Sequence, residues 1–119
     1  MAKFKRAPQS FHREVSESDM DRLVDWIKEI NRRYYNQHFP NLNPPTFRYQ
    51  MGPTNIKVIV VGDDGKDQSV WCFVERASGA IMKAGSWKAP EPKRYERGNI
   101  HMFEGWSKWL TPNGPQYIN

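Results

Sequence analysis

The chain has 119 residues, of which 38% are hydrophobic and 13% aromatic, and its formal net charge is +5. This length suits one domain that buries a core without disulfides or metals. No apolar run reaches the roughly 20 residues of a membrane helix, and a single cysteine excludes a disulfide scaffold. We therefore expect one domain in a reducing cytoplasm, with no membrane partner.

The first 17 residues are predicted to be a basic arm that precedes a domain of residues 18–119. Lys3, Lys5 and Arg6 lie in a stretch of 13 residues without an acid, and Pro8 disfavours a helix there. The stretch lacks the apolar run of a secretory signal. Two interpretations stay open, namely an arm laid along phosphates and a frayed terminus.

One amphipathic helix is predicted from Ser18 to about His38. Ser18 suits the N-cap, with Asp21 three residues later as in a capping box. Apolar residues then recur at spacings of three and four, which places them on one helix face: Met20, Leu23, Val24, Ile27, Ile30 and Tyr34. Pro40 prevents the helix from continuing. Trp26 lies off that face and either packs on a neighbouring segment or is an exposed contact.

Four short strands are predicted to follow, over residues 46–51, 55–61, 69–76 and 80–83. The first alternates, with Phe47, Tyr49 and Met51 on one side. The second, NIKVIVV, is β-branched and nearly continuous, which favours a central position in the sheet. The third is predicted to place Trp71 and Phe73 on one face, and a turn with Gly79 at positive φ joins it to the fourth.

The final segment, residues 101–119, has no clear period but is too apolar for a free tail. We expect it to wrap back onto the body, with a helical turn over residues 103–110 as one option. The whole pattern predicts an α+β fold. One N-terminal amphipathic helix packs on a three- to four-stranded antiparallel sheet, followed by an irregular C-terminal segment.

Three patterns that resemble catalytic or metal sites have simpler interpretations. The acidic stretch GDDGKDQ (residues 62–68) suits a turn and lacks EF-hand spacing. Glu91 and Lys93 have the spacing of a nuclease ExK element, but Pro92 would break the strand on which that pair normally lies. Cys72 is expected to be a small core hydrophobe. We expect no catalytic residue, metal or cofactor, and keep a weak nuclease as an alternative.

The strongest candidate binding site lies in residues 83–97. Five cations and two aromatic rings are interleaved there: Lys83, Lys88, Lys93, Arg94 and Arg97 with Trp87 and Tyr95. Cations neutralise phosphates and flat rings stack on unpaired bases. Two alternatives stay open. Trp87 could fill the core beneath a solvated loop, and Arg97 could pair with a carboxylate in a structural turn.

Several strings follow in order along the middle third of the chain: SVWCFV at residues 69–74, Gly79, KAGSWKAP at 83–90 and RGNI at 97–100. This pattern resembles a group of short proteins encoded by tailed bacteriophages, which share S-V-x-x-F-[IV], K-A-x-S-W-K-A-P and R-G-N-I. The segment between the last two strings is longer here than in the group. The resemblance implies a phage product that acts in the host bacterial cytoplasm or is carried in the virion. It implies no chemistry.

We predict a small basic nucleic-acid-binding protein of phage origin without catalytic activity. Its phosphate contacts would be Lys83, Lys88, Lys93, Arg94 and Arg97, with Lys3, Lys5 and Arg6 as a second contact. Trp87 and Tyr95 would stack on bases, and the choice between single strands and duplex stays open. The alternative is a protein-binding module that inhibits or redirects a host factor, or a minor virion component. That alternative predicts an exposed aromatic patch around Trp106 and Trp109.

Overall fold

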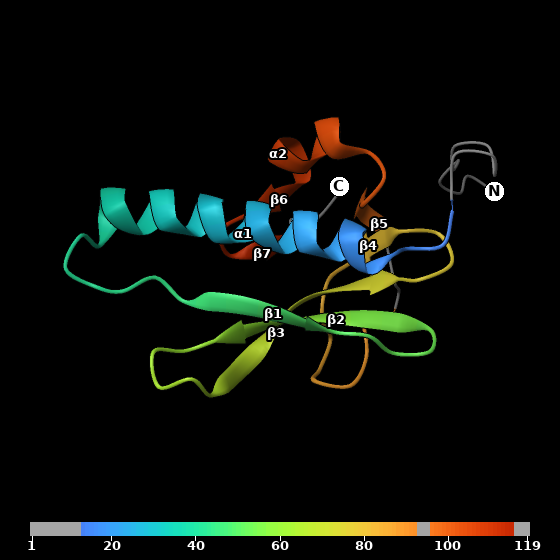
Figure 1. The fold of residues 1–119 in the computed structure, drawn as a ribbon, viewed down its shortest axis with the longest axis horizontal. Coiled ribbons are helices and arrows are strands. Elements are labelled where there is room, and N and C mark those ends of the chain that lie inside the picture. Colours follow the sequence, from blue (N-terminus) through green and yellow to red (C-terminus); the bar gives the residue numbers. More distant parts are fainter. Residues whose placement is uncertain (1–12, 93–95, 116–119) are drawn as a thin grey trace.

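The computed structural model describes residues 13–92 and 96–115. Helix α1 (Glu17–His38) lies across one face of an antiparallel five-stranded sheet of order β1-β2-β3-β4-β5 (Figure 1). The strands are β1 (Thr46–Gln50), β2 (Asn55–Val61), β3 (Asp67–Glu75), β4 (Ala80–Met82) and β5 (Glu96–Asn99). The predicted α+β class is confirmed, and β5 adds a strand to those expected.

The start of α1 differs from the prediction, because the N-cap is Ser16 and not Ser18. Ser16 Oγ accepts a hydrogen bond from Asp19 N at 3.2 Å, and Ser16 N donates to the Asp19 carboxylate at 2.9 Å. Arg13 donates two further hydrogen bonds to this carboxylate, at 2.9 and 2.8 Å. Burial alone would raise the pKa of Asp19, but the hydrogen bonds from Ser16 and Arg13 outweigh it and lower that pKa below 3.8.

Residues 13–16, which the sequence analysis assigned to the arm, contact the body of the domain. Val15 is buried in the core, and its N–H donates to Arg76 O at 2.9 Å. The ring of His101 lies against Arg13, with Nε2 2.8 Å from Arg13 O and Nδ1 3.1 Å from Arg13 Nη1. These contacts attach the start of the domain to the turn after β3 and to the segment after β5.

The core fills the space between α1 and the sheet. Alternation along the strands turns every second side chain toward the helix. The sheet contributes Phe47, Ile56, Val58, Cys72, Val74 and Ile81, and the helix contributes Met20, Leu23, Val24 and Ile27. Burial raises the pKa of the Cys72 thiol. This supports its interpretation as a core hydrophobe and not a nucleophile.

Trp71 and Phe73 do not share a face, contrary to the prediction. Two adjacent residues of β2, 58 and 59, pair with residues 72 and 70 of β3, so Trp71 is the extra residue of a β-bulge. The bulge turns Trp71 toward the core, where its ring lies 6.5 Å from that of Phe47. Its Nε1 donates to Pro112 O at 3.2 Å. The bulge thus moves one large ring to the helix side.

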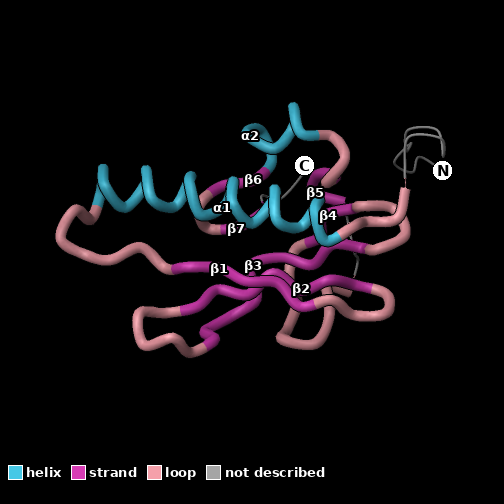
Figure 2. Tube along the Cα trace, viewed as in Figure 1, coloured by secondary structure: helices cyan, strands magenta, loops and turns pink. Residues whose placement is uncertain are grey.

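The C-terminal segment wraps back onto the body, as predicted, and it does so on the helix side of the sheet. It forms η2 (Phe103–Gly105), α2 (Trp106–Trp109), β6 (Leu110–Thr111) and β7 (Gly114–Pro115), which Figure 2 shows on the same side as α1. Trp106 is buried, so the predicted exposed patch around it is wrong. Its ring packs edge to face on Trp26 at 5.6 Å, which confirms packing for Trp26. In the described part of the chain, no helix has the length and apolarity to cross a membrane.

Candidate functional site

The loop of residues 83–91 projects from the sheet face opposite α1 (Figure 1). Backbone hydrogen bonds close it on itself: Glu91 N to Lys83 O, Gly85 N to Ala89 O and Ser86 N to Ala89 O, each 3.0 Å. A Cβ at Gly85 would lie 2.9 Å from Pro90 O, so only glycine fits this close approach. The loop therefore holds its tip, Trp87 and Lys88, in a defined place.

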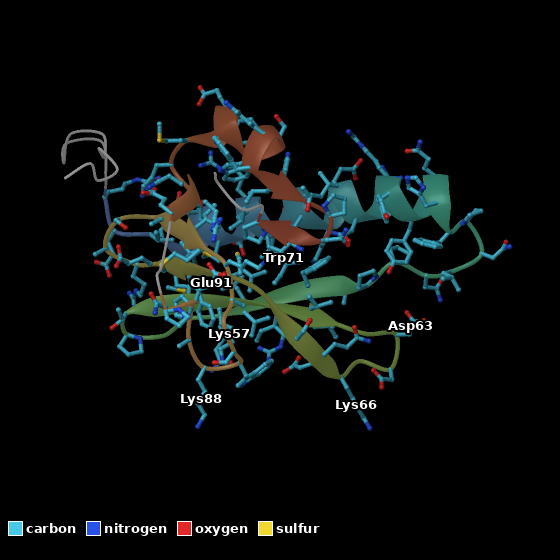
Figure 3. The ribbon with its side chains drawn as sticks, turned by 180° about the vertical axis from the view of Figure 1, so that it is seen from behind. Lys57, Asp63, Lys66, Trp71, Lys88 and Glu91 are labelled. Atoms are coloured by element: carbon cyan, nitrogen blue, oxygen red, sulfur yellow. The ribbon has the colours of Figure 1, made fainter. Side chains whose placement is uncertain are left out.

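Trp87 at the tip is exposed over 43% of its surface, so it does not fill the core. Lys57 Nζ lies 4.2 Å from the centroid of the Trp87 ring, within the range of a cation–π contact. Lys88 follows directly and is exposed. Figure 3 shows Lys57 and Lys88 near each other on the side of the sheet away from α1. One exposed ring and two cations thus occupy one region.

The sheet face opposite α1 is called the outer face and is formed by Arg48, Lys57, Ile59, Phe73 and Met82 with the loop of residues 83–91. Arg48 donates to Asp67 at 3.0 and 2.6 Å, which lowers the pKa of that carboxyl and compensates the Arg48 charge. Lys66 is also exposed, but it lies in the turn before β3, at the same end of the molecule as Asp63 and away from Lys57 (Figure 3). Among the described residues, no ion pair includes Lys57, Lys66 or Lys88. The outer face therefore presents two lysines that form no ion pair, Lys57 and Lys88, although Lys57 lies close enough to Asp67 to help lower the pKa of that carboxyl.

Sequence reasoning missed Lys57, because residues 55–61 were predicted to form the central strand from their nearly continuous β-branched run. β2 is instead second in the sheet, and β3 lies in the middle. Gln50 is the partner of Lys57 on β1. The available signal was a lysine in an otherwise apolar strand. The strand before it in the sequence has one polar side, which indicates that this face of the sheet is partly exposed.

A groove of about 330 Å³ lies beside Trp87, between residues 68–70 of β3 and residues 84–87 of the loop. On its far side, β3 pairs with β4 only at Phe73 and Val74. The backbone of residues 68–70 therefore has no pairing partner from β4. A flat group stacked on Trp87 would lie next to residues 68–70 of β3.

The other predicted contacts divide into three groups. Lys83 is half-buried at the base of the loop. Arg97 is only 1% exposed and donates from Nη2 to Glu91 Oε1 at 2.7 Å. The predicted phosphate contact of Arg97 is therefore wrong, and its alternative, pairing with a carboxylate, is confirmed. The remaining six lie outside the described residues: Lys3, Lys5, Arg6, Lys93, Arg94 and Tyr95.

The nuclease alternative gains no support from the described residues. Glu91, its proposed metal ligand, accepts the hydrogen bond from buried Arg97. Within residues 13–92 and 96–115, no group of three or more His, Cys, Asp or Glu side chains is placed to hold a metal ion. The acidic turn has a structural role as predicted, because Asp64 Oδ1 accepts a hydrogen bond from Lys66 N at 3.0 Å.

Comparison with known proteins places most of the chain in one family. A sequence profile described as a family of unknown function, DUF7717, matches residues 3–110. No curated protein and no solved structure matches the chain.

Proposed function

We propose that this chain, which belongs to the DUF7717 family, binds single-stranded nucleic acid through the outer face of its sheet. The observation that carries the proposal is the exposed ring of Trp87 held beside Lys57. An exposed tryptophan at the tip of a closed loop suits a base that is free to leave its stack. Duplex bases are already stacked on each other and do not offer this contact.

Two physical effects support binding at this face. Stacking of a base on an aromatic ring contributes about 1–3 kcal/mol by alanine substitution. Lys57 and Lys88 can neutralise phosphates and release counterions, which makes affinity fall with salt. The hydrogen bonds inside the loop reduce the entropy lost on binding, because the tip is held in place before the ligand arrives.

Phage origin, and with it a location in the bacterial cytoplasm or virion, remains a prediction from the resemblance. The protein-binding alternative has a different structural basis from the one predicted. Met102 and Phe103 are each 50% exposed and adjacent, and the Phe103 ring packs on Trp106 at 5.0 Å. This apolar pair would bind a partner in a way that resists salt.

The test is fluorescence anisotropy with labelled single-stranded DNA, duplex DNA and RNA across a salt series. We expect the single strands to bind more tightly than duplex, with affinity that falls as salt rises. Trp87→Ala should weaken single-strand binding by about 1–3 kcal/mol. Lys57→Ala and Lys88→Ala should each lower the salt slope by about one.

The matched control is Phe103→Ala, because Phe103 is as exposed as Trp87 but lies in η2 and not on the outer face. Its affinity for single strands should equal that of the unmodified chain. Thermal melts should show that the Trp87→Ala and Phe103→Ala variants both stay folded. Weak, salt-independent binding to all three nucleic acids, or equal losses in both variants, would overturn the proposal.

A further inference from the structure

A second concave region lies near the C-terminal end of α1, and its volume is about 760 Å³. The second half of α1, the loop that follows it, the turn between β2 and β3 and the turn between β6 and β7 all contribute to its lining. The volume lies in the range of small-molecule sites in proteins, about 300–1,000 Å³. This region is called the cleft.

Aromatic rings make up much of the cleft lining. Phe47 and Trp71 come from the sheet and pack edge to face, with an interplanar angle of 82°. Tyr34, Tyr35 and Phe39 come from the end of α1, and the Tyr35 and Phe39 rings lie 5.5 Å apart. Ring faces carry negative electrostatic potential, so they attract cations as well as apolar groups.

Asn31 supplies a polar group to the cleft. Its side chain is only 4% exposed, and Nδ2 donates to Ile27 O at 3.0 Å. Because a carbonyl only accepts, the amide nitrogen must face Ile27 O, and this fixes Oδ1 on the other side of the carboxamide. No hydrogen bond in the described structure reaches this Oδ1. Because Asn31 lines the cleft, this oxygen can accept a hydrogen bond from a donor group of a ligand.

The charges around the cleft favour a positive ligand. Asp63 and Asp64 line it, and its lining contains no lysine, arginine or histidine. Neither carboxylate forms an ion pair within the part of the chain that the structure describes. The last turns of α1 also lie here, and the C-terminal end of a helix carries partial negative charge. Figure 3 shows Asp63 at the end of the molecule away from Lys57 and Lys88.

We infer that the cleft binds an organic cation, a guanidinium or ammonium group on a short apolar stem. The aromatic rings would contact the stem and the cation, Asn31 Oδ1 would accept one N–H, and Asp63 and Asp64 would compensate the charge. An anion would meet two carboxylates and no cation. Such a group is carried both by free small amines and by the arginine and lysine side chains of a peptide.

The experiment is an NMR titration of the ¹⁵N-labelled chain with three probes. Agmatine represents a free guanidinium, and acetyl-Gly-Arg-Gly-amide represents a peptide side chain. The same peptide with citrulline is nearly identical in shape but neutral. We expect both cations to shift the Asn31 side-chain amide and the Trp71 indole N–H, and the citrulline peptide to leave them in place. Tighter binding of agmatine or of the arginine peptide identifies the source of the cation.

Two variants test the role of the carboxylates. Asp63→Asn and Asp64→Asn should each weaken arginine-peptide binding about two- to fivefold. The asparagine at position 64 can still accept the hydrogen bond from Lys66 N. The matched control is Glu104→Gln, which removes the same charge from an exposed residue of η2 outside the cleft. It should leave affinity unchanged.

Equal binding of the citrulline peptide, equal losses in the control, or shifts confined to the outer face would each overturn the inference. Cation binding in the cleft is tested independently of single-strand binding, because the cleft and the Trp87 groove are lined by different aromatic residues. Either proposal can therefore fail while the other stands.

Discussion

The outer face and the cleft are both lined by tryptophan, yet the charges around the two rings have opposite signs. Trp87 has Lys57 over its ring, whereas Trp71 shares a cavity with Asp63 and Asp64. The net charge of +5 describes neither region. Basic composition therefore raises the expectation of an anionic partner for the whole chain, but each local surface has to be assigned its own ligand.

The two regions also differ in how the chain builds them. The ring and one lysine of the outer face come from a single contiguous loop, which closes through its own backbone hydrogen bonds. The cleft draws on residues from Asn31 in α1 to Asn113 in the β6–β7 turn. A substitution within residues 83–91 should thus disrupt the outer face and leave the cleft intact.

The largest effect is expected for Glu91→Ala, which removes the carboxylate that pairs with buried Arg97 at 2.7 Å. Breaking one side of a buried ion pair costs about 3–5 kcal/mol, and we expect about 3 because the Glu91 side chain keeps 21% of its surface exposed. Urea denaturation measures this loss. Single-strand affinity should fall as well, because the Glu91 side chain links the end of the loop that carries Trp87 to buried Arg97.

The control is the double variant Glu91→Ala with Arg97→Met, which should recover most of the lost stability because no buried charge remains. Binding of the arginine peptide in the cleft should be unchanged in both variants at temperatures where they are folded. A parallel loss of cleft binding would show that the two regions are coupled and would contradict the comparison.

The parts of the fold that follow from local signals were predicted from sequence. Spacing of apolar residues identified α1, alternation identified β1, and Gly79 marked the turn before β4, where its φ is 80°. Strand β5 was not predicted, because Glu96–Asn99 has neither alternation nor β-branched residues. It is a strand through its pairing with β4, which is a tertiary property.

The same distinction applies to the binding regions. Trp87 and Lys88 were predicted because the loop that carries them is contiguous and rich in cations and rings. Arg97 belongs to the same stretch, but its burial depends on Glu91 and could not be read from composition. The cleft was not predicted at all. A bulge at Trp71, which no residue pattern announced, turns that ring toward the helix side.

A smaller effect is expected for Asp19→Asn, which weakens the capping box of α1. We expect a loss of about 1–2 kcal/mol near pH 7, measured by urea denaturation. The pKa of Asp19 is lowered below 3.8 in the folded chain, so its stabilisation is complete above that value and is lost as pH falls through the folded pKa. Below about pH 4 the unmodified chain should therefore lose stability more steeply than the variant.

This pH dependence sharpens the comparison, because Asp19 lies at the opposite end of α1 from the cleft. If cation binding already weakens while the pH is falling toward about 5, the loss of this cap cannot be the cause, because Asp19 is still ionised there. Parallel stability curves for the two chains down to pH 3 would contradict the role assigned to Asp19.

The smallest effect on stability is expected for Gly62→Ala. A Cβ there would lie 2.3 Å from Gln68 Nε2, which is the free end of a flexible side chain, and the φ of Gly62 is outside the left-handed region. Alanine lowers the conformational entropy of the unfolded chain, and this stabilisation would offset part of the free-energy cost of crowding Gln68. The free energy of unfolding should therefore change by less than about 0.5 kcal/mol.

Gln68 lines both the cleft and the Trp87 groove, so this variant probes the border between the two regions. If the displaced amide contributes to both, arginine-peptide and single-strand affinities should each fall about twofold, and Gln68→Ala should reproduce both losses. The same anisotropy and NMR titrations measure them. A loss confined to one ligand would assign Gln68 to that region and leave the other independent, because Gln68 is the one residue of the described chain that lines both cavities.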